Sequence, residues 1–381
     1  MKGDLLVVAG EASGDLHGGR LLEALAERAP ELRAFGLGGE RMIAAGLAPV
    51  ADVSAISVVG IAEAVAILSR AREIFRQTLA AVEARRPLAA VLIDFPEFNL
   101  RLARQLAWLG IPVVYYVSPQ IWAWRRGRVR TLADCVERML VLFPFEVPFY
   151  RRHGVPVVHV GHPLVDEVPR LPQAWQGEPR HGSRAPRRIA LLPGSRRSEI
   201  AALLPTLLES ARRIALDTPS EFRLLRAPSI SDDDLAPFLR DVDLPIQVVE
   251  TERLEAIADS HLAICASGTA TLEVGLLGTP MIVVYRLNPW SFRLGRLLVR
   301  VPHFSLVNLV LERGVVPELL QHDARPERIA AEALPLLASA KASLPQREAL
   351  RELRALLGPP GASERAADQV LAAIAGRSAA A

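Results

Sequence analysis

Short apolar runs alternate along the chain with longer stretches in which apolar residues recur about every 3.6 positions, the period of an α-helix. In the first half, the short runs predict buried strands at Leu5–Ala9, Ala89–Ile93, Val113–Val117 and Met139–Leu142. The longer stretches predict helices at Leu16–Arg28, Ile61–Arg86 and Leu100–Leu109. Such alternation predicts a parallel sheet with helices on both of its faces.

The pattern breaks at residues 169–188, where four prolines and two glycines stand in a stretch of little periodicity, as is typical of a linker. The alternation then restarts, with strands expected at Ile189–Leu192, Phe222–Arg226, Ile246–Val249, His261–Cys265 and Met281–Tyr285, and helices at Glu199–Ala215 and Ala270–Leu277. We therefore expect an α/β chain with two Rossmann-like, doubly wound domains, residues 1–168 and 189–345. A helical tail, residues 346–381, is expected either to cross back to the first domain or to swap into a partner chain.

Composition narrows the class of protein. Half of the 381 residues are apolar, which excludes a disordered chain, and 45 Lys and Arg against 42 Asp and Glu leave a net charge of +3. A charge this weak does not indicate a nucleic-acid-binding protein. Two isolated cysteines, Cys135 and Cys265, build no disulfide framework or zinc site. With no secretory signal and no apolar stretch near about 18 residues, we expect a soluble or peripherally attached protein of the cytoplasm.

Ligands of open parallel sheets bind beyond the carboxyl ends of the strands, and the loop after the first strand has the sequence GEASGD, residues 10–15. Its glycines permit a tight turn, and the free N–H groups of the next helix favour an anion. A plain turn with Ser13 or Asp15 as helix N-cap is the alternative. The spacing is not that of a dinucleotide fingerprint.

The loop at residues 93–99 begins with Asp94, which follows an apolar strand and precedes Pro96. A carboxylate held at the ligand edge of a sheet can accept a proton from a substrate hydroxyl, so Asp94 is a candidate general base. In the alternative interpretation Asp94 is a turn residue, and Asn99 caps the next helix in either case.

Two loops of the second half suit a phosphate group. Residues 192–199 combine Gly194, Ser195 and Arg196 with a helix start, although Ser198 can simply cap that helix and Arg196 can be a surface residue. Residues 266–273 open a helix with small side chains, which also serve tight packing. The residues of interest there are Ser267, Gly268, Thr269, Ala270 and Glu273. Together the two loops predict one diphosphate-binding site, with Glu273 in reach of ribose hydroxyls.

Two further segments combine arginines with indole or apolar side chains, a combination that suits an anionic lipid surface. Packing in a core with a solvated edge is the alternative for each. The residues are Trp122, Trp124, Arg125 and Arg126 in the first segment, and Trp290, Arg293, Arg296 and Arg300 in the second.

The run Asp232–Asp234 resembles a metal-binding motif of some sugar transferases, but it follows Ser231 and precedes an apolar-periodic stretch. It therefore predicts a helix start with acidic residues in its first turn. The eight histidines show no metal-ligand spacing, and Cys265 within a strand is expected to be a core residue.

Taken together, several ordered motifs resemble those of the lipid-A-disaccharide synthases, from Ala9 to about Gln321: GEASGD, IDFPEFN, YYVSPQIWAWR, LFPFE, GHPL, LLPGSR, ASGTATLE and SLVN…VPELLQ. The resemblance implies a GT-B fold, in which two Rossmann-like domains face each other across a cleft. It implies a hexosyltransferase that moves 2,3-diacylglucosamine, with inversion, from its UDP conjugate to 2,3-diacylglucosamine 1-phosphate. The products would be UDP and the β-1,6-linked lipid A disaccharide 1-phosphate.

The resemblance also implies a setting: lipid monosaccharide substrates, no metal or other cofactor, and peripheral attachment to the cytoplasmic face of the inner membrane of a Gram-negative bacterium. It leaves open a monomer or a dimer swapped through its C-terminal tail. Another UDP-sugar enzyme of the same fold, such as a transferase to a different lipid or a UDP-N-acetylglucosamine 2-epimerase, is the main alternative. A nucleotide-sugar-binding or membrane-scaffold protein without catalysis is a third hypothesis, which the presence of both Asp94 and Arg196 disfavours.

Residue roles follow from the same resemblance. Asp94 would deprotonate the acceptor 6-hydroxyl, and Arg196 with the helix starts after Ser195 and Gly268 would stabilise the departing UDP. The remaining roles are Glu273 on the ribose, Asn308 and Gln321 in the active cleft, Ser13, Gly14 and Asp15 on the acceptor side, and the Trp and Arg segments against acyl chains and anionic lipid. Two residues depart from the family pattern: Val307 stands where Pro is expected, and Glu97 where Asp is usual.

Overall fold

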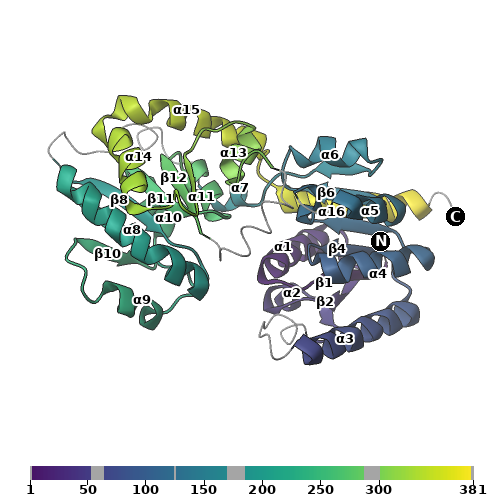
Figure 1. Cartoon of the computed structure of the whole chain (residues 1–381). Helices are drawn as coiled ribbons and strands as arrows, with labels where there is room; N and C mark the ends of the chain where they lie inside the picture. Colours follow the sequence, from purple (N-terminus) through teal and green to yellow (C-terminus); the bar gives the residue numbers. More distant parts are fainter. Residues whose placement is uncertain (1, 53–63, 124–125, 170–184, 287–300, 379–381) are drawn as a thin grey trace. The chain divides into compact units, whose positions relative to one another are not determined.

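The computed structural model describes residues 2–52, 64–123, 126–169, 185–286 and 301–378, which form two α/β units (Figure 1). The first unit comprises residues 1–163 together with 358–381, and the second comprises residues 164–357. The chain therefore leaves the first unit once and returns to it near the C-terminus.

The first unit is built on a seven-stranded parallel sheet in the order β3-β2-β1-β4-β5-β6-β7. Its strands are β1 (Gly3–Ala9), β2 (Leu32–Leu37), β3 (Ala48–Pro49), β4 (Ala89–Ile93), β5 (Val113–Tyr116), β6 (Arg138–Val141) and β7 (Val157–His159). Its helices are α1 (Ala12–Arg28), α2 (Glu40–Ala44), α3 (Ala64–Arg85), α4 (Pro96–Trp108), α5 (Val129–Cys135), α6 (Glu146–Arg152) and α16 (Ala362–Ser378), with short 3₁₀ turns η3 (Gln120–Trp122) and η4 (Arg126–Arg128).

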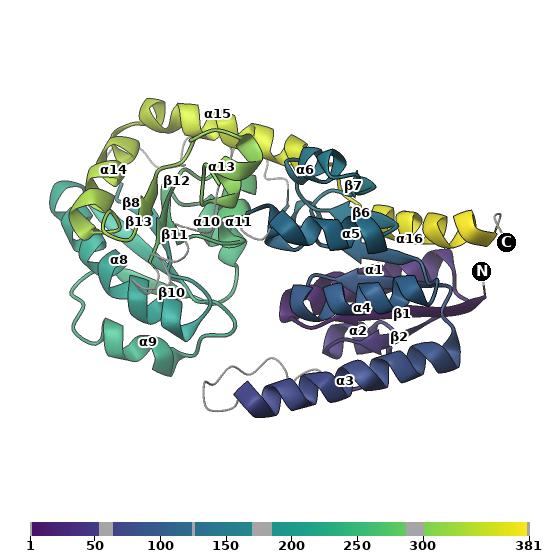
Figure 2. The same cartoon turned by 45° about the vertical axis from the view of Figure 1, so that its right-hand side comes forward.

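Helices cover both faces of this sheet. Alternate residues of the strands pack under α3, α4, α5 and α6 on one face and under α1, α2 and α16 on the other. The strands are thus apolar on both sides, which is why their sequences are nearly unbroken apolar runs. Figure 2 shows α16, the yellow C-terminal helix, in this unit beside α1.

The second unit has a six-stranded parallel sheet in the order β10-β9-β8-β11-β12-β13. Its strands are β8 (Arg187–Leu192), β9 (Ser220–Leu225), β10 (Ile246–Val249), β11 (Leu262–Ala266), β12 (Met281–Tyr285) and β13 (Glu318–Leu320). Its helices are α7 (Leu164–Glu167), α8 (Arg197–Asp217), α9 (Asp232–Leu239), α10 (Arg253–Ala258), α11 (Ala270–Leu276), α13 (Leu306–Leu311), α14 (Pro326–Ala338) and α15 (Ala340–Leu356).

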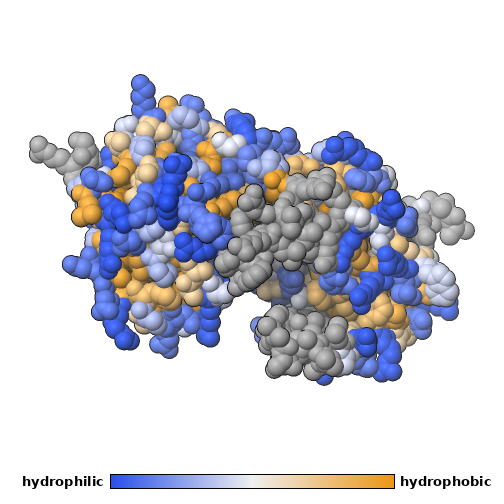
Figure 3. Space-filling model, in the orientation of Figure 1, coloured by the Kyte–Doolittle hydropathy of each residue, from blue (hydrophilic) through white to orange (hydrophobic). Residues whose placement is uncertain are grey.

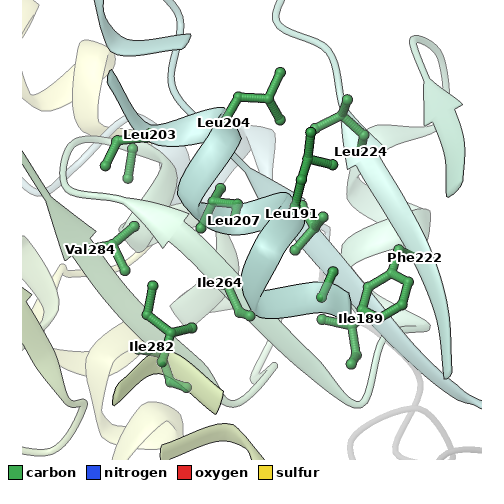
Figure 4. Close-up of a cluster of buried hydrophobic side chains, with 14 of the residues drawn as sticks. Ile189, Leu191, Leu203, Leu204, Leu207, Phe222, Leu224, Ile264, Ile282 and Val284 are labelled. Carbon is green, nitrogen blue, oxygen red and sulfur yellow. The ribbon is translucent and has the colours of Figure 1, made fainter. Parts of the chain in front are cut away.

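One core of this unit lies between the sheet and helices α8, α9 and α14. Figure 4 shows part of it, where Leu203, Leu204 and Leu207 of α8 lie over side chains from four neighbouring strands, among them Phe222 and Ile264. The other face carries α11, with α10, α13 and α15 packed against that helix. Cys265 is fully buried in β11, as the sequence predicts.

The division between the units differs slightly from the predicted boundaries. Residues 164–169 belong to the second unit because Arg354 of α15 donates hydrogen bonds to the carbonyls of Val165 (3.3 Å) and Val168 (3.0 Å). The tail divides at the Gly-Pro-Pro-Gly sequence 358–361, so α15 stays in the second unit and α16 joins the first. The segment 170–184 of the predicted linker lies outside the described residues.

On the face shown in Figure 3, polar side chains are mixed with smaller apolar areas over both units. The two most exposed large apolar side chains of the described residues lie at helix ends: Trp108 ends α4, and Leu216 lies near the end of α8. Among the described helices, none is both long and apolar enough to cross a bilayer.

Candidate active site

The sheet of the first unit reverses its winding between β1 and β4, the topological switch point where such folds bind ligands. Ala9 pairs in register with Ile93, so Gly10 and Asp94 leave neighbouring strands side by side. The first two loops singled out in the sequence, 10–15 and 93–99, are therefore brought together at one edge of this sheet.

The backbone at Asp94 is strained and firmly held. Asp94 and the next residue, Phe95, have φ angles of 43° and 49°, in the left-handed region that non-glycine residues rarely adopt. The Asp94 carbonyl accepts hydrogen bonds from the Tyr115 hydroxyl (2.6 Å) and from Nδ2 of Asn99 (2.8 Å), and its N–H donates to Tyr116 (3.1 Å). Strain of this kind costs about 1–3 kcal/mol per residue and persists where surrounding contacts over-determine it, as at functional sites.

Gly10 is required by the packing of Phe95. A Cβ atom at Gly10 would lie 2.5 Å from ring atoms of Phe95, far inside van der Waals contact. The same ring stacks on Phe98 with a centroid separation of 5.3 Å. The glycine of the first loop thus permits the turn that presents Asp94.

The electrostatic surroundings of Asp94 suit a general base. Burial, and to a smaller extent the charge of Glu11, raises the pKa of Asp94 to about 6. A carboxyl group with this pKa is ionised at neutral pH yet more basic than an ordinary aspartate, which favours proton transfer from a hydroxyl.

Beside this turn lies an open pocket of about 850 Å³. It is lined by residues 9–12, Asp15, 38–41, Ile43 and 49–52. Both carboxylate oxygens of Asp15 accept backbone N–H groups at the start of α2, from Gly39 (2.7 Å), Arg41 (3.1 Å) and Met42 (3.1 Å). Asp15 therefore shapes the pocket wall, while Ser13 is exposed and Gly14 is buried in the first turn of α1.

The expected helix caps in these loops are wrong. Helix α1 begins at Ala12 with Glu11 as its N-cap, instead of Ser13 or Asp15. Helix α4 begins at Pro96, so Asn99 lies inside it, where its buried amide holds the carbonyls that end β4. For α4 the sequence did carry a start signal, since Pro96 stands in the first turn, a position that proline favours.

The second sheet has its own switch point, between β8 and β11. Leu192 pairs with Cys265, so the loops 193–196 and 266–269 leave neighbouring strands at one edge. The loops at residues 192–199 and 266–273 are thus adjacent, as a single diphosphate-binding site formed by both would require.

Glu199 organises the third loop. One carboxylate oxygen accepts the N–H groups of Ser195 (2.9 Å) and Arg196 (3.3 Å), and the other accepts the Arg196 guanidinium (3.0 Å). Gly194 adopts a φ of 118°, and a Cβ there would lie 2.4 Å from Glu199, so only glycine fits. The N-cap of α8 is Arg196, not Ser198. A carboxylate thus occupies the N–H groups at this helix start, and the Arg196 side chain stays 79% exposed.

The fourth loop is held by its own hydroxyl groups. Ser267 donates to the carbonyl of Phe304 (3.1 Å), and Thr271 donates to that of Gly268 (2.7 Å). Thr269 is exposed, and Ala270 is the first residue of α11. Burial raises the pKa of Glu273, an effect that nearby Arg253 partly offsets.

Asn308 is buried, with only 1% of its surface exposed, and all of its side-chain atoms are engaged. Its Nδ2 donates to Val316 (2.9 Å) and Glu318 (2.8 Å), and its Oδ1 accepts from Val315 (2.8 Å) and Val316 (3.0 Å). Through these hydrogen bonds, Asn308 fixes the conformation of the segment 305–318. Glu318, which also accepts the N–H of Ser305 (2.9 Å), lies in the VPELLQ motif, but the sequence alone gave it no role.

The two departures from the family pattern have structural counterparts. Val307 is fully buried in α13, and Ser305 fixes the start of that helix by accepting the N–H of Asn308 (3.1 Å), so no proline is needed there. Glu97 accepts a hydrogen bond from Arg128 (2.6 Å), which ties α4 to η4. Gln321 has a φ of 52° and donates its N–H to Tyr285 (2.9 Å).

The structure describes only part of the two segments expected to meet lipid. Trp122 is half-buried, and its Nε1 donates to Glu146 (3.0 Å). Arg126 begins η4. Trp124, Arg125, Trp290, Arg293, Arg296 and Arg300 lie outside the described residues.

The acidic run 232–234 begins α9, as the sequence predicts. Ser231 caps this helix and exchanges hydrogen bonds with Asp234, which also pairs with Arg197 (2.9 Å). Within the part of the chain that the structure describes, no cluster of three or more His, Cys, Asp or Glu side chains could hold a metal ion.

Comparison with known proteins decides the family. Residues 5–374 match the family model described as lipid-A-disaccharide synthetase. The lipid-A-disaccharide synthase of Anaeromyxobacter dehalogenans is 47% identical over 371 residues, which cover 96% of each chain. The chain belongs to the lipid-A-disaccharide synthase family. The relative of the same name from Myxococcus xanthus is 43% identical over 369 residues, again 96% of each chain. The resemblance inferred from the motifs is therefore confirmed.

Solved structures support the fold expected of this family. The glycotransferase of kitacinnamycin aligns with a TM-score of 0.63 at 18% sequence identity, covering 98% of this chain and 100% of that chain. At this identity the likeness shows the fold alone. It confirms the expected GT-B architecture of two Rossmann-like domains.

Proposed function

We propose that the chain transfers 2,3-diacylglucosamine from UDP-2,3-diacylglucosamine to 2,3-diacylglucosamine 1-phosphate, with inversion. The products are UDP and the β-1,6-linked lipid A disaccharide 1-phosphate. The observation that carries this proposal is the family match over residues 5–374. The geometry of the two switch points supplies chemistry that fits it.

Asp94 acts as the general base. The acceptor 6-hydroxyl gives its proton to the Asp94 carboxylate while its oxygen attacks the anomeric carbon of the donor, and the bond from that carbon to UDP breaks. One base and no covalent intermediate suffice for inversion. The pKa of Asp94, raised to about 6 by burial and by Glu11, supports this role. The pocket at residues 9–12 and 38–41 supports binding of the acceptor sugar, beside Ser13, Gly14 and Asp15.

The second unit stabilises the leaving group. Negative charge grows on the diphosphate as UDP departs, and preorganised donors aimed at such charge lower the barrier. Arg196 and the N–H groups of Ser195 and Arg196 are the donors, and the diphosphate displaces the Glu199 carboxylate that occupies them in this structure. The turns that face the diphosphate are formed by Gly194, Ser267, Gly268, Thr269 and Ala270. Glu273 contacts the ribose, and Gln321 lies beside the donor. Asn308 acts as a positioning residue through the 305–318 segment.

These donors replace a metal ion in the proposal, and no cofactor takes part. The acylated substrates place the enzyme at an anionic membrane surface, so it works as a peripheral protein on the cytoplasmic face of the inner membrane. The residues that contact acyl chains and lipid headgroups are Trp122, Trp124, Arg125, Arg126, Trp290, Arg293, Arg296 and Arg300. The tail acts within its own chain, as α16 packs against α1 through an apolar face that includes Val370 and Ile374.

The test is a product assay in detergent with both diacylated substrates, with and without EDTA. We expect the disaccharide 1-phosphate and UDP in equal amounts at an EDTA-independent rate. A rate that collapses with EDTA contradicts the metal-free mechanism. No disaccharide, with UDP binding intact, contradicts the assigned acceptor and favours another UDP-sugar enzyme of this fold.

Two variants separate catalysis from binding. Asp94→Asn removes the base and is expected to bind UDP as the wild type does while losing at least about 100-fold in turnover, the usual contribution of a general base. Asp134→Asn, at an exposed aspartate of α5, is the matched control and should keep full activity. Full activity of Asp94→Asn would contradict the base assignment.

A further inference from the structure

A buried carboxyl group that the proposed reaction does not use lies under the loop that follows β5. Glu146 is the first residue of α6 and is only 2% exposed. One of its oxygens accepts the indole N–H of Trp122 (3.0 Å), and the other accepts the backbone N–H of Phe143 (3.2 Å). Burial raises the pKa of Glu146 to about 7, although hydrogen bonds from Ser118, Phe143, Trp122 and Leu142 oppose the shift. A buried acid normally requires such partners.

Aromatic rings hold the other side of Trp122. Its indole meets the Phe145 ring edge-on at a centroid distance of 4.9 Å, and Phe145 stacks on Phe143 at 5.4 Å. The indole has one polar atom, its N–H donor, and Glu146 accepts that donor. Trp122 is therefore fixed in both position and orientation.

A second pair of side chains clamps the start of the same loop. The hydroxyls of Ser118 and Tyr150 lie 2.6 Å apart, and Tyr150 is on α6, as Glu146 is. Val117, just before Ser118, has a φ of 61°, an unfavourable angle for a β-branched residue. Helix α6 thus holds the loop at residues 117–123 at two points, although the backbone of this loop is strained at Val117.

This loop leaves the strand that anchors the candidate base. The carbonyl of Tyr116 accepts the N–H of Asp94 (3.1 Å), and the Tyr115 hydroxyl donates to the Asp94 carbonyl (2.6 Å). Strand β5 lies between β4 and β6, so the loop begins next to Asp94 at the carboxyl edge of the sheet. The sequence continues from Trp122 into Trp124, Arg125 and Arg126.

We propose that Glu146 is a positioning residue for the acceptor lipid: through Trp122 it fixes the 117–123 loop, which holds the acceptor so that its hydroxyl meets Asp94. An apolar residue at 146 would leave the indole N–H and the Phe143 N–H without this acceptor, and the loop would shift to find water. This inference rests on the proposed function, because it assigns the loop to the acceptor of that reaction.

The experiment compares kcat and the two KM values of the full-length protein in mixed micelles. Glu146→Ala removes the acceptor atoms, and Trp122→Phe keeps an aromatic ring but removes the N–H donor. Both variants are expected to raise the KM for the acceptor by about five- to tenfold, the range of one lost hydrogen bond. The donor KM and kcat at saturating acceptor should stay within about twofold, because both groups belong to the first unit, whereas the loops proposed to bind the donor belong to the second.

Two controls separate positioning from general stability. Glu146→Gln keeps an oxygen for the indole N–H but sets an amide NH2 against the Phe143 N–H, so its acceptor KM is expected to lie between those of the wild type and Glu146→Ala. Trp108→Phe changes an indole that is 82% exposed at the end of α4 and should change no kinetic constant. If Glu146→Ala does not fold, Trp122→Phe decides by itself.

Three results would overturn the inference: an unchanged acceptor KM in Trp122→Phe, an equal rise in both KM values, or a fall in kcat with the acceptor KM unchanged. Each assumes that the wild type forms the disaccharide. A wild-type protein without that activity contradicts the proposed function instead, so the two failures are distinguishable.

Discussion

The hydroxyl of Tyr115 donates a 2.6 Å hydrogen bond to the backbone carbonyl of Asp94. Tyr115 lies near the end of β5 and Asp94 directly follows the neighbouring β4, and Asp94 needs support because its φ of 43° is in the left-handed region. Burial, and then the nearby Asp94 charge, raises the pKa of Tyr115 far above its usual range, so the hydroxyl stays protonated and remains a donor.

Tyr115→Phe should therefore disturb Asp94 without changing the packed ring. Loss of this hydrogen bond leaves a buried carbonyl with one partner fewer, and we expect about 1 kcal/mol lower stability and several-fold lower kcat. Denaturant unfolding and the product assay measure the two effects. Thr279→Val, which removes a buried hydroxyl hydrogen bond to the carbonyl of Ile257 (2.9 Å) in the second unit, is the control and should keep kcat. Wild-type kcat in Tyr115→Phe would show that Asp94 does not need this support.

The acid limb of the pH–rate profile should reflect the ionisation of the Asp94 carboxyl group. A general base works only when ionised, so kcat/KM is expected to be constant above pH about 6 and to fall about tenfold per unit below it. Glu11→Gln removes a negative charge that raises the pKa of Asp94, so the limb should move to lower pH. Glu23→Gln, exposed on α1, should leave the limb in place. An acid limb that Glu11→Gln shifts to higher pH would contradict this electrostatic account.

Asp94 should also lower stability at neutral pH. Its pKa is about 6 in the folded protein against 3.8 as the ordinary value, so between these values the folded state retains a proton that the unfolded chain has lost. Stability from this group is complete below pH 3.8 and is lost as the pH rises through about 6. Asp94→Asn avoids the loss and should be more stable at pH 8 by up to about 3 kcal/mol, at 1.36 kcal/mol per pKa unit.

Thermal unfolding at pH 3.5 and at pH 8 measures this linkage. The variant should melt above the wild type at pH 8 and together with it at pH 3.5. Identical melting at pH 8 would mean that burial does not penalise the ionised carboxylate.

Gly10→Ala should move the turn that carries Asp94. The new methyl group would lie 2.5 Å from the Phe95 ring, and overpacking of this kind costs about 1–3 kcal/mol. We expect lower stability together with a large loss of kcat. Gly127→Ala adds the same methyl group where no atom lies within 4 Å, and it should behave as wild type. Equal behaviour of the two variants would contradict the packing argument.

The sequence predicts most of the central strands because burial on both faces makes them unbroken apolar runs, as in β4 and β11. It does not predict β2, β3, β7 or β13. Strand β2 contains Arg33 and Gly36, β3 has two exposed residues, and β7 and β13 have three residues each, so none carries a distinct apolar run.

Strand order explains why the candidate loops could be found in the sequence. The backbone angles and hydrogen bonds within these loops could not be found in the same way. Any loop after a parallel strand reaches the ligand edge, so residues 10–15 and 93–99 could be singled out without coordinates. The left-handed turn at Asp94 had no such signal, because neither Asp94 nor Phe95 is a glycine. Glu199 stands three residues after the N-cap, the spacing of a capping box, but the N-cap is Arg196 where that motif has Ser or Thr, so the sequence pattern did not reveal it.

The chain leaves the first unit after Pro163 and re-enters it at Gly358. A ribosome releases the chain from its N-terminus, so strands β1–β7 emerge roughly 200 residues before α16, an interval of about 10–40 s at 5–20 residues per second. During that interval Leu21 and Leu25 of α1 lack the helix that covers them in the finished fold. The second unit can mature first, while the unit that carries Asp94 is completed by α16, which emerges after the second unit. A premature stop codon between Leu357 and Ala362 would therefore remove part of the apolar core of the first unit, the unit that carries Asp94.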